Sequence, residues 1–146
     1  MASSVLDNIK RTTQQTIDGF RKWDIDAIMA PRAENCTYQA LPQSLGLPPH
    51  NNQEYREWYT SQIIPLMQNF DVEVHTILHD AEARKSMIHG FSTATSPVGP
   101  YRMELCLMMS FNEAGDKVVK MEEMFDSAYY GDLMSKLQEM MAGQAQ

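Results

Sequence analysis

The chain has 146 residues, enough for one domain that buries roughly two-thirds of its unfolded surface. A formal net charge of −7 and a pI near 5.0 argue against nucleic-acid binding, because phosphate recognition needs clustered lysine and arginine. No apolar run approaches a membrane span and no signal-peptide core follows Met1–Ser4, so we expect a cytoplasmic protein without membrane contact.

The first half of the chain predicts helices around one short strand. Ser4 and Asp7 are a capping pair before an amphipathic segment, and a short second helix begins near Asp24 or Asp26 and ends by Pro31. The elements expected next are a strand over Asn35–Leu41 and a proline-rich loop over Pro42–Asn52. A third helix then begins with Asn51 or Asn52 as its cap, and Pro65 marks a kink or its last turns. Its apolar positions are Tyr55, Trp58, Tyr59, Leu66 and Phe70.

From Phe70 onward the apolar period changes to alternation, which predicts strands. The expected strands are a half-exposed one through Val72, Val74, Thr76 and Leu78, and long ones over Arg84–Thr95, Tyr101–Asn112 and Lys117–Asp126. Turns are expected at Asp80–Ala83, Ser96–Pro100 and Glu113–Asp116. A closing helix follows Ser127, with Leu133, Leu137 and Met140 on one side. Helices followed by an antiparallel meander indicate one α+β domain over residues 1–146. Because long hairpin strands coil, we expect a cone whose mouth accepts a ligand.

The last predicted strand places a carboxylate among hydrophobic residues. Strand alternation puts Val119, Met121, Glu123 and Phe125 on one face. A buried carboxylate needs a partner or takes up a proton, and either state suits acid–base chemistry. Glu123 is therefore the first candidate for a catalytic residue.

Three further ionisable groups are candidates, each with a structural alternative. Arg32 could bind an oxyanion or hold Glu123 ionised, or it could form a salt bridge with Glu34. His89 alternates with apolar neighbours and is either a hydrogen-bonded core residue or a catalyst. Glu104 is a second acid on a mostly apolar face and could pair with His89 or Arg32.

Several motifs together resemble a known group of proteins. They are Trp23–Asp26, Pro31–Tyr38, Leu41–Gly46, Asn51–Tyr55, Gly99-Pro100-Tyr101 with Glu104, Phe111–Lys117, and Glu123 with Phe125-Asp126-Ser127. This set resembles the branch of small fungal isomerases and cyclases of meroterpenoid, xanthone and indole-alkaloid pathways, within the SnoaL-like, NTF2-like superfamily. The resemblance runs from about Asp18 to Leu137, and Leu105 departs from it, because a second tyrosine often follows the glutamate there.

The resemblance implies an NTF2-like (SnoaL-like) cone and a set of pocket residues. It places Tyr101 in the pocket, where a phenol can polarise a carbonyl oxygen. Tyr38 and Trp58 are expected to contact substrate, with a structural role as the alternative for Tyr38. Glu54 and Asp126 are expected near the substrate too, although a carboxylate in the first turn of a helix and one just before a helix are both typical of capping.

We expect a cofactor-independent isomerase or cyclase that acts on a polycyclic intermediate by proton transfer. The sequence has no metal motif, no glycine-rich phosphate loop and no Gly-x-Ser-x-Gly elbow. The alternatives are a dehydratase or ring-opening hydrolase of the same fold, and a non-catalytic binding or dimerisation module.

The sequence also predicts a homodimer. Met103, Leu105, Leu107 and Met109 lie on one side of a single strand, and we expect the sheet face that does not line the cavity to pack against a second subunit. His50, His75 and His79 are expected on the surface.

Overall fold

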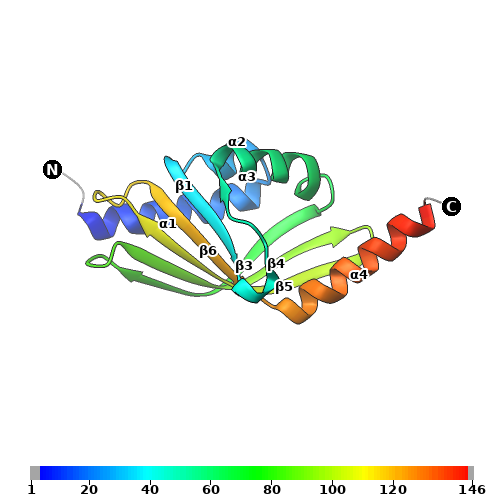
Figure 1. Ribbon diagram of the computed structural model, residues 1–146. Helices are drawn as coiled ribbons and strands as arrows, with labels where there is room; N and C mark the ends of the chain where they lie inside the picture. Colours follow the sequence, from blue (N-terminus) through cyan, green and yellow to red (C-terminus); the bar gives the residue numbers. More distant parts are fainter. Residues whose placement is uncertain (1–3, 145–146) are drawn as a thin grey trace.

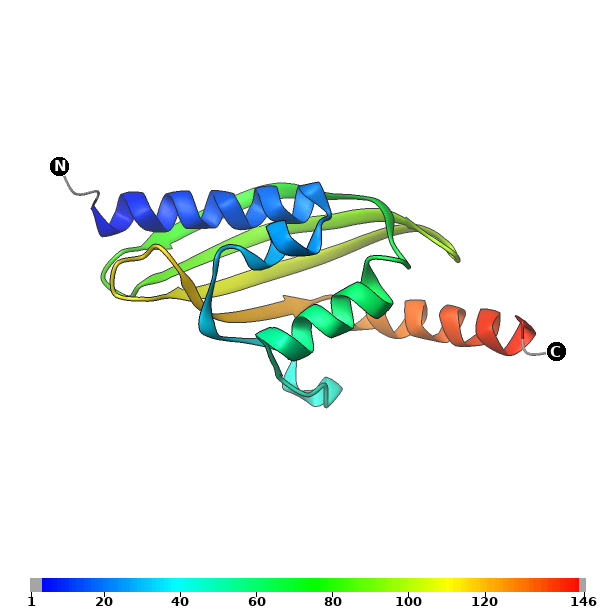
Figure 2. The same ribbon diagram turned by 90° about the horizontal axis from the view of Figure 1, so that it is seen from above.

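The computed structural model describes residues 4–144 as helices packed against one coiled sheet. The helices are α1 (Val5–Lys22), α2 (Ile25–Met29), α3 (Asn52–Trp58) and α4 (Ser127–Gln144), with a 3₁₀ turn η1 (Gln43–Leu45) and a π-helical turn η2 (Tyr59–Ile63). The strands are β1 (Arg32–Leu41), β2 (His50–Asn51), β3 (Gln68–Asp80), β4 (Lys85–Ser96), β5 (Gly99–Phe111) and β6 (Val118–Phe125). Helices α1, α2 and α3 lie on one side of the sheet, and α4 extends away from the end of β6 (Figures 1 and 2).

The strands form one sheet in the order β2-β1-β6-β5-β4-β3. Pairs β3–β4, β4–β5 and β5–β6 are the predicted antiparallel meander. The pair β1–β6 is parallel, because the chain leaves β1, forms α3 and the meander, and returns beside β1 in the same direction. The predicted α+β class with a curved sheet is confirmed.

The predicted helix starts agree with the structure, and one helix end does not. Ser4 Oγ accepts a hydrogen bond from the Asp7 amide at 3.0 Å, and Asp24 caps α2. The third helix is shorter than expected: η2 ends it at Ile63, and β3 begins at Gln68. Phe70 is therefore a strand residue, whose ring stacks on that of Trp23 with centroids 3.8 Å apart.

The two faces of β5 are the reverse of the expected arrangement. Met103, Leu107 and Met109 are buried against the helices, so they are not the outer patch of a dimer. The outer face of the sheet instead carries Leu78 and Met124, which are 56% and 42% exposed. The opposite face of β5 carries Arg102, Glu104 and Ser110, so the more apolar face of this strand is the one buried against the helices.

A buried polar seam lies between α1 and the sheet. Thr13 Oγ1 and Ser86 Oγ are 3.0 Å apart and buried. His79 is paired with Ser86 in the β3–β4 register, and its Nδ1 is buried with no hydrogen-bond partner among the described residues. His79 is therefore half-buried, where a surface position was predicted, and burial, followed by the nearby Lys10 charge, lowers its pKa.

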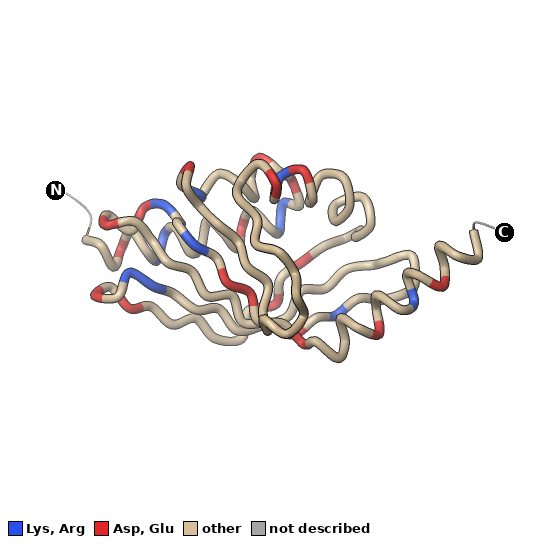
Figure 3. The backbone as a smooth tube through the Cα atoms, in the orientation of Figure 1, with Lys and Arg blue, Asp and Glu red and all other residues tan. Residues whose placement is uncertain are grey.

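Charged residues are spread over the surface. Figure 3 shows acidic and basic positions interspersed along the chain, with no large patch of basic residues. Residues 4–144 contain no helix that is both long enough and apolar enough to cross a membrane.

Gly90 sits where β3 and β4 approach most closely. A Cβ at this position would lie 2.1 Å from the backbone oxygen of Glu73, next to an irregularity in the β3 register between Val74 and Thr76. We predict that Gly90→Ala lowers the free energy of unfolding by more than about 2 kcal/mol, because backbone must move to admit the methyl group.

The matched control is Gly131→Ala in α4, where an added Cβ meets nothing within 4 Å. This change should raise the free energy of unfolding by roughly 0.5–1 kcal/mol, the usual gain for replacing a helical glycine. Urea denaturation of both variants measures the contrast. If both substitutions changed the free energy of unfolding by equally small amounts, the backbone at the β3–β4 contact would have moved at little cost.

Candidate active site

A cavity of about 370 Å³ lies between the helices and the inner face of the sheet. It is lined mainly by aromatic and aliphatic side chains, with few polar groups, which is typical of a site for a bulky, mostly apolar ligand. The polar lining residues are Thr16, Tyr38, His50, Tyr59, Ser92, Tyr101, Glu123 and Tyr130, and the large apolar ones include Phe20, Trp23, Trp58, Phe70, Met103, Leu107, Phe125 and Met134.

Glu123 lies in the cavity wall, as its position on β6 predicted. The parallel β1–β6 register pairs it with Ala40, whose small side chain leaves room beside the carboxylate. Tyr38, two residues earlier on β1, donates its hydroxyl to Glu123 Oε1 at 2.7 Å. Two neighbouring strands therefore hold a carboxylate and a phenol together inside an apolar cavity.

The environment of Glu123 favours its protonated form more than water does. Burial raises the pKa of Glu123, while the Tyr38 hydrogen bond and then the charge of Arg32 oppose that increase. A raised pKa makes the carboxylate a stronger base and brings its proton exchange closer to neutral pH. The charge of Arg32 thus lowers the pKa of Glu123 as expected, but by less than burial raises it.

The tyrosines of the site remain neutral hydroxyl donors. Burial raises the pKa of Tyr55 to about 12 against the opposing charge of Arg32. Burial also raises the pKa of Tyr38, Tyr59 and Tyr101 well above their ordinary value. Tyr101, which lines the cavity, can therefore donate a hydrogen bond to a ligand oxygen at any physiological pH without carrying charge.

Arg32 lies behind the cavity wall and does not line the cavity. Its guanidinium carbon is 3.7 Å from the ring centroid of Tyr55, and its side-chain nitrogens are buried without hydrogen-bond partners among residues 4–144. The ring face of Tyr55 compensates part of the cost of burying this charge. Direct contact of Arg32 with a ligand in the cavity, expected from the sequence, is not supported, because Arg32 is buried and is not among the lining residues.

His50 lines the cavity, although it was predicted to lie on the surface. It is paired with Tyr38 in the β1–β2 register, and its ring lies against those of Tyr38 and Trp58, with centroids 6.4 Å and 5.1 Å away. Strand β2 has only two residues, so no alternation in the sequence could reveal which way His50 points. Trp58 and Tyr38, both expected at the pocket, are in the lining.

A second polar point in the cavity is formed by Tyr101. Its hydroxyl oxygen lies 3.3 Å from Ser92 Oγ, and both residues are in the lining. The charge of Glu123 contributes to the raised pKa of Tyr101, so the two groups act within one cavity. The pocket position expected for Tyr101 agrees with the structure, and Ser92 was not anticipated.

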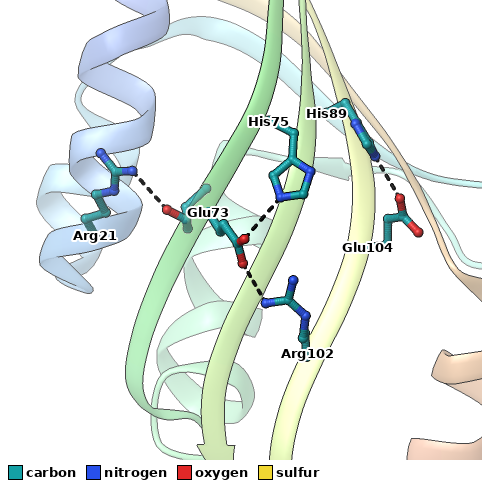
Figure 4. A network of polar contacts seen from close by, with 7 residues as sticks. Arg21, Glu73, His75, His89, Arg102 and Glu104 are labelled. Carbon is teal, nitrogen blue, oxygen red and sulfur yellow. Dashed lines mark hydrogen bonds and ion pairs between the residues drawn. The ribbon is translucent and has the colours of Figure 1, made fainter.

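His89 and Glu104 lie on the outer face of the sheet, outside the cavity. His89 Nε2 is 2.8 Å from Glu104 Oε2, so the expected pair exists, but its side chains are 33% and 51% exposed. Figure 4 shows this pair on β4 and β5 beside a second cluster, in which Glu73 contacts His75 and Arg102. The sequence predicted that Glu104 could pair with His89, but it did not show that both lie on the outer face of the sheet.

Glu54 and Asp126 are helix caps. Glu54 Oε1 accepts from the Asn51 amide at 3.0 Å, while Asn51 Oδ1 accepts from the Glu54 amide, which completes a capping box. Asp126 Oδ1 accepts from the amides of Ala128 and Tyr129, both at 3.1 Å. Both carboxylates are exposed and neither lines the cavity. Their contacts are therefore those of helix caps, the structural alternative that the sequence offered.

The donor set of the cavity suits proton transfer. Within residues 4–144 no group of three or more histidine, cysteine, aspartate or glutamate side chains is arranged to hold a metal ion. The cavity lining offers one carboxylate, one imidazole and several hydroxyls. These groups can remove a proton from carbon and stabilise the charge that develops on an oxygen.

Proteins of known sequence identify the family. No model of a protein family matches the chain. Monooxygenase nsrQ of Aspergillus novofumigatus is 35% identical over 131 residues, which are 90% of this chain and 86% of that protein. Monooxygenase AacuP of Aspergillus aculeatus is 32% identical and covers 91% of each chain. The chain belongs to the family of these fungal proteins. A further member, the ergochrome gene cluster protein of Claviceps purpurea, is 30% identical over 81% of this chain and 76% of that protein.

Solved structures of fungal biosynthetic proteins share the fold of this family member. The BvnE pinacolase of Penicillium brevicompactum superimposes with a TM-score of 0.89 over 95% of this chain and 97% of that chain, at 23% identity. PrhC of Penicillium brasilianum gives 0.87 at 24% identity over 95% and 93%. Outside these fungal proteins, an NTF2-like protein of Burkholderia pseudomallei gives a TM-score of 0.68 at 16% identity over 83% of this chain and 92% of that chain. The NTF2-like, SnoaL-like fold and the membership among fungal secondary-metabolite proteins, both predicted from the sequence, are confirmed.

The raised pKa of Glu123 makes a prediction about stability. In the folded protein its pKa lies above the ordinary value of 4.5, so ionising it in the cavity costs folding free energy. That cost is absent below the unfolded pKa and develops as the pH rises through the folded pKa. Glu123→Gln removes the ionisation and can still accept from Tyr38, so it should be more stable than the wild type by about 1 kcal/mol, or about 3 °C in Tm, at pH 7.

Thermal unfolding at pH 4 and pH 7 measures this difference. The gain should shrink as the pH falls towards 4, because protonation of Glu123 removes the charge that burial disfavours. Glu104→Gln on the outer face is the control, and no comparable pH-dependent gain is expected for it. A Glu123→Gln protein less stable than the wild type at pH 7 would mean that Tyr38 and Arg32 outweigh burial.

Proposed function

We propose that the protein is a cofactor-independent isomerase or cyclase that rearranges a polycyclic intermediate of fungal secondary metabolism. The observation that carries the proposal is the hydrogen bond from Tyr38 to the carboxylate of Glu123 inside a cavity lined mainly by aromatic and aliphatic side chains. A carboxylate with a raised pKa in such a place is characteristic of general acid–base sites.

In the proposed reaction Glu123 accepts a proton from an activated carbon of the substrate. The electron pair of the broken C–H bond moves onto a neighbouring carbonyl oxygen, which forms an enolate. Tyr101, supported by Ser92, offers a neutral donor to an oxygen of the substrate. Glu123 then returns the proton to a different atom, so that an isomerisation or ring closure needs no added reagent. General acid–base help of this kind contributes roughly 10²–10⁴-fold to the rate.

The cavity walls support the proposal through orientation. Rings of Trp58, Tyr59 and Phe70, among others, line the same cavity as the carboxylate. A planar polycyclic molecule held between such faces keeps few of its conformers, and holding a reactive conformer accelerates an intramolecular step. The apolar lining also keeps water from quenching an enolate.

The two alternatives from the same fold differ in the fate of water. A dehydratase would use protonated Glu123 to protonate a leaving hydroxyl, and a ring-opening hydrolase would use the carboxylate to activate water. A non-catalytic binding module has no need of an inward carboxylate, whose burial costs stability. Isomerisation or cyclisation is preferred because it requires only the proton transfers that Glu123 and its neighbours can make.

A second candidate activity is oxygenation, favoured by the name monooxygenase that nsrQ and AacuP carry. The same carbanion could react with molecular oxygen, as in R₂CH₂ + O₂ → R₂C=O + H₂O. In this balance the substrate supplies all the electrons, O₂ is reduced, and one of its atoms leaves as water. The first step, removal of a proton by Glu123, is shared with the isomerisation.

Anthrone tests the shared step, because it is a flat polycyclic ketone with an acidic CH₂ group. Under argon in D₂O, the wild type should accelerate exchange of that CH₂ as followed by NMR, in the presence of a chelator and without additives. Glu123→Gln should lower the protein-catalysed exchange by about 100-fold or more, the scale of losing a general base.

Glu104→Gln, on the outer face of the sheet, is the matched control and should stay within about threefold of the wild type, since it does not line the cavity. Near-normal exchange by Glu123→Gln would remove Glu123 from the mechanism. Oxygen consumption with anthraquinone as product would select the monooxygenase, and exchange without oxygen consumption would select the isomerase or cyclase.

We further propose that the protein is a homodimer that buries the outer face of the sheet. Leu78 and Met124 are exposed there, with half-buried Met87 and Met108 between them in the strand registers. No described helix covers this face, because α1, α2 and α3 pack on the other side (Figure 1). An uncovered apolar sheet face flanked by ion pairs is typical of a surface that binds a second copy.

Leu78→Glu combined with Met124→Glu should convert the dimer into a folded monomer, because like charges would meet across a two-fold interface. Met141→Glu on α4, where the side chain is 63% exposed, is the control and should leave the dimer intact. Sedimentation velocity at about 10 μM measures all three proteins. A monomeric wild type would contradict the proposed dimer.

A further inference from the structure

We propose that His50 is a second catalytic residue of the cavity, which donates a hydrogen bond or a proton to an oxygen of the bound substrate while Glu123 handles the proton on carbon. The proposal rests on the proposed function and deepens it. It names the group that stabilises the enolate oxygen, and it implies a substrate with a carbonyl or phenol oxygen at this wall.

The first argument is the position of His50. The β1–β2 register places it directly across from Tyr38, the residue whose hydroxyl binds Glu123. Side chains of directly paired residues point to the same face of a sheet, and both residues line the cavity. The imidazole and the carboxylate therefore lie on either side of one tyrosine in the same wall.

The second argument is that the imidazole has no protein partner. No hydrogen bond within the described part of the chain engages either ring nitrogen of His50. Nδ1 is fully buried, whereas Nε2 is not, so Nε2 is the nitrogen that a ligand in the cavity can reach. Several other polar groups of the lining are paired: Tyr38 with Glu123, Tyr101 with Ser92, and Trp23 Nε1 with the Met67 carbonyl. A ligand oxygen that pairs with Nε2 therefore gains a hydrogen bond without breaking one inside the protein.

The third argument is that the ring is held in place without using its nitrogens. It lies stacked on Trp58, with centroids 5.1 Å apart and an interplanar angle of 28°, and nearly parallel to Tyr38 at 14°. These contacts fix the plane of the imidazole and leave Nε2 free for a ligand. A preorganised donor of this kind stabilises developing charge without rearranging at the moment of reaction.

The proton balance closes with the two residues. Glu123 takes the proton from carbon as the C–H bond breaks, and the electron pair moves to the carbonyl oxygen. His50 supplies its N–H to that oxygen, either as a hydrogen bond or as a transferred proton. In the second half Glu123 delivers its proton to the new position and His50 recovers its own, so nothing is oxidised and no co-reactant is consumed.

The test compares two substitutions of His50 with one of an exposed histidine. His50→Phe keeps a flat ring against Trp58 but has no nitrogen, and His50→Gln restores a donor near the Nε2 position. His75→Phe, on the outer face of the sheet, is the matched control. Exchange of the anthrone CH₂ in D₂O should fall at least tenfold in His50→Phe, recover in part in His50→Gln, and change less than twofold in His75→Phe.

A second readout uses anthraquinone, which has the carbonyl oxygens but no acidic CH₂, and therefore reports on binding alone. Quenching of tryptophan fluorescence measures its affinity, and ¹⁵N NMR follows the imidazole nitrogens. Saturation with anthraquinone should shift the His50 nitrogens and leave those of His75 in place. Glu123→Gln should lose exchange yet keep this shift.

The outcomes separate the inference from the function on which it rests. Wild-type exchange in His50→Phe, absence of saturable anthraquinone binding, or unchanged His50 nitrogens at saturation would each overturn the role of His50. A wild type that shows the His50 shift but catalyses no exchange would overturn the proton-transfer function and leave His50 as a ligand-binding donor.

Discussion

The hydrogen bond from Tyr38 to Glu123 is the interaction on which the site depends. It joins β1 to β6, the one parallel pair of the sheet among the described residues, and so links the N-terminal segment to the end of the meander. It also leaves an ionisable group inside a cavity that is otherwise apolar. Burial raises the pKa of that group more than Tyr38 and Arg32 lower it, and this balance, not a single strong partner, sets its reactivity.

Arg32 shows how a charge can act on the site without touching a ligand. It is 7% exposed, its nitrogens are unpaired, and the ring of Tyr55 covers it. A salt bridge in direct contact would fix Glu123 as a carboxylate and weaken it as a base. With the guanidinium kept behind aromatic rings, its field lowers the pKa of Glu123 only in part, so the carboxylate remains able to accept a proton.

The sequence predicted the fold and the central acid well because both depend on local patterns. Helix starts follow from Ser4, Asp24 and Asn51, and the alternation on β6 places Glu123 inward. The same alternation failed for His89 and Glu104 on the neighbouring strands. On β4 the outward Met87 and Phe91 are larger and more apolar than the inward Ser86, Gly90 and Ser92, so the pattern favoured the wrong face. Glu104 pairs with Phe91 and lies on the same outer face.

His50 was missed for a different reason. Its strand has two residues and follows a proline-rich loop, so its direction is set by pairing with Tyr38, a contact between residues 12 positions apart in the sequence. Glu54 and Asp126 were expected near the substrate from their motifs, but both bind backbone amides instead, because a carboxylate at a helix start lies close to unpaired amide groups. Pairing across the sheet is what brings an imidazole to the wall that local sequence assigned only to a tyrosine and a glutamate.

The names of the sequence relatives and of the structural neighbours point to different chemistries, and the fold alone does not choose between them. Monooxygenase nsrQ and the BvnE pinacolase differ in name, and the fold they resemble carries no reaction by itself. In the mechanism proposed for this protein, abstraction of a proton from an activated carbon leads to an enolate, which both isomerisation and oxygenation can use. The outcome is then decided by what the enolate meets: a second carbon of its own skeleton, a proton, or oxygen. In a cavity lined by aromatic side chains, the substrate's shape and the access of oxygen would decide among them, while the proposed first step at Glu123 stays the same.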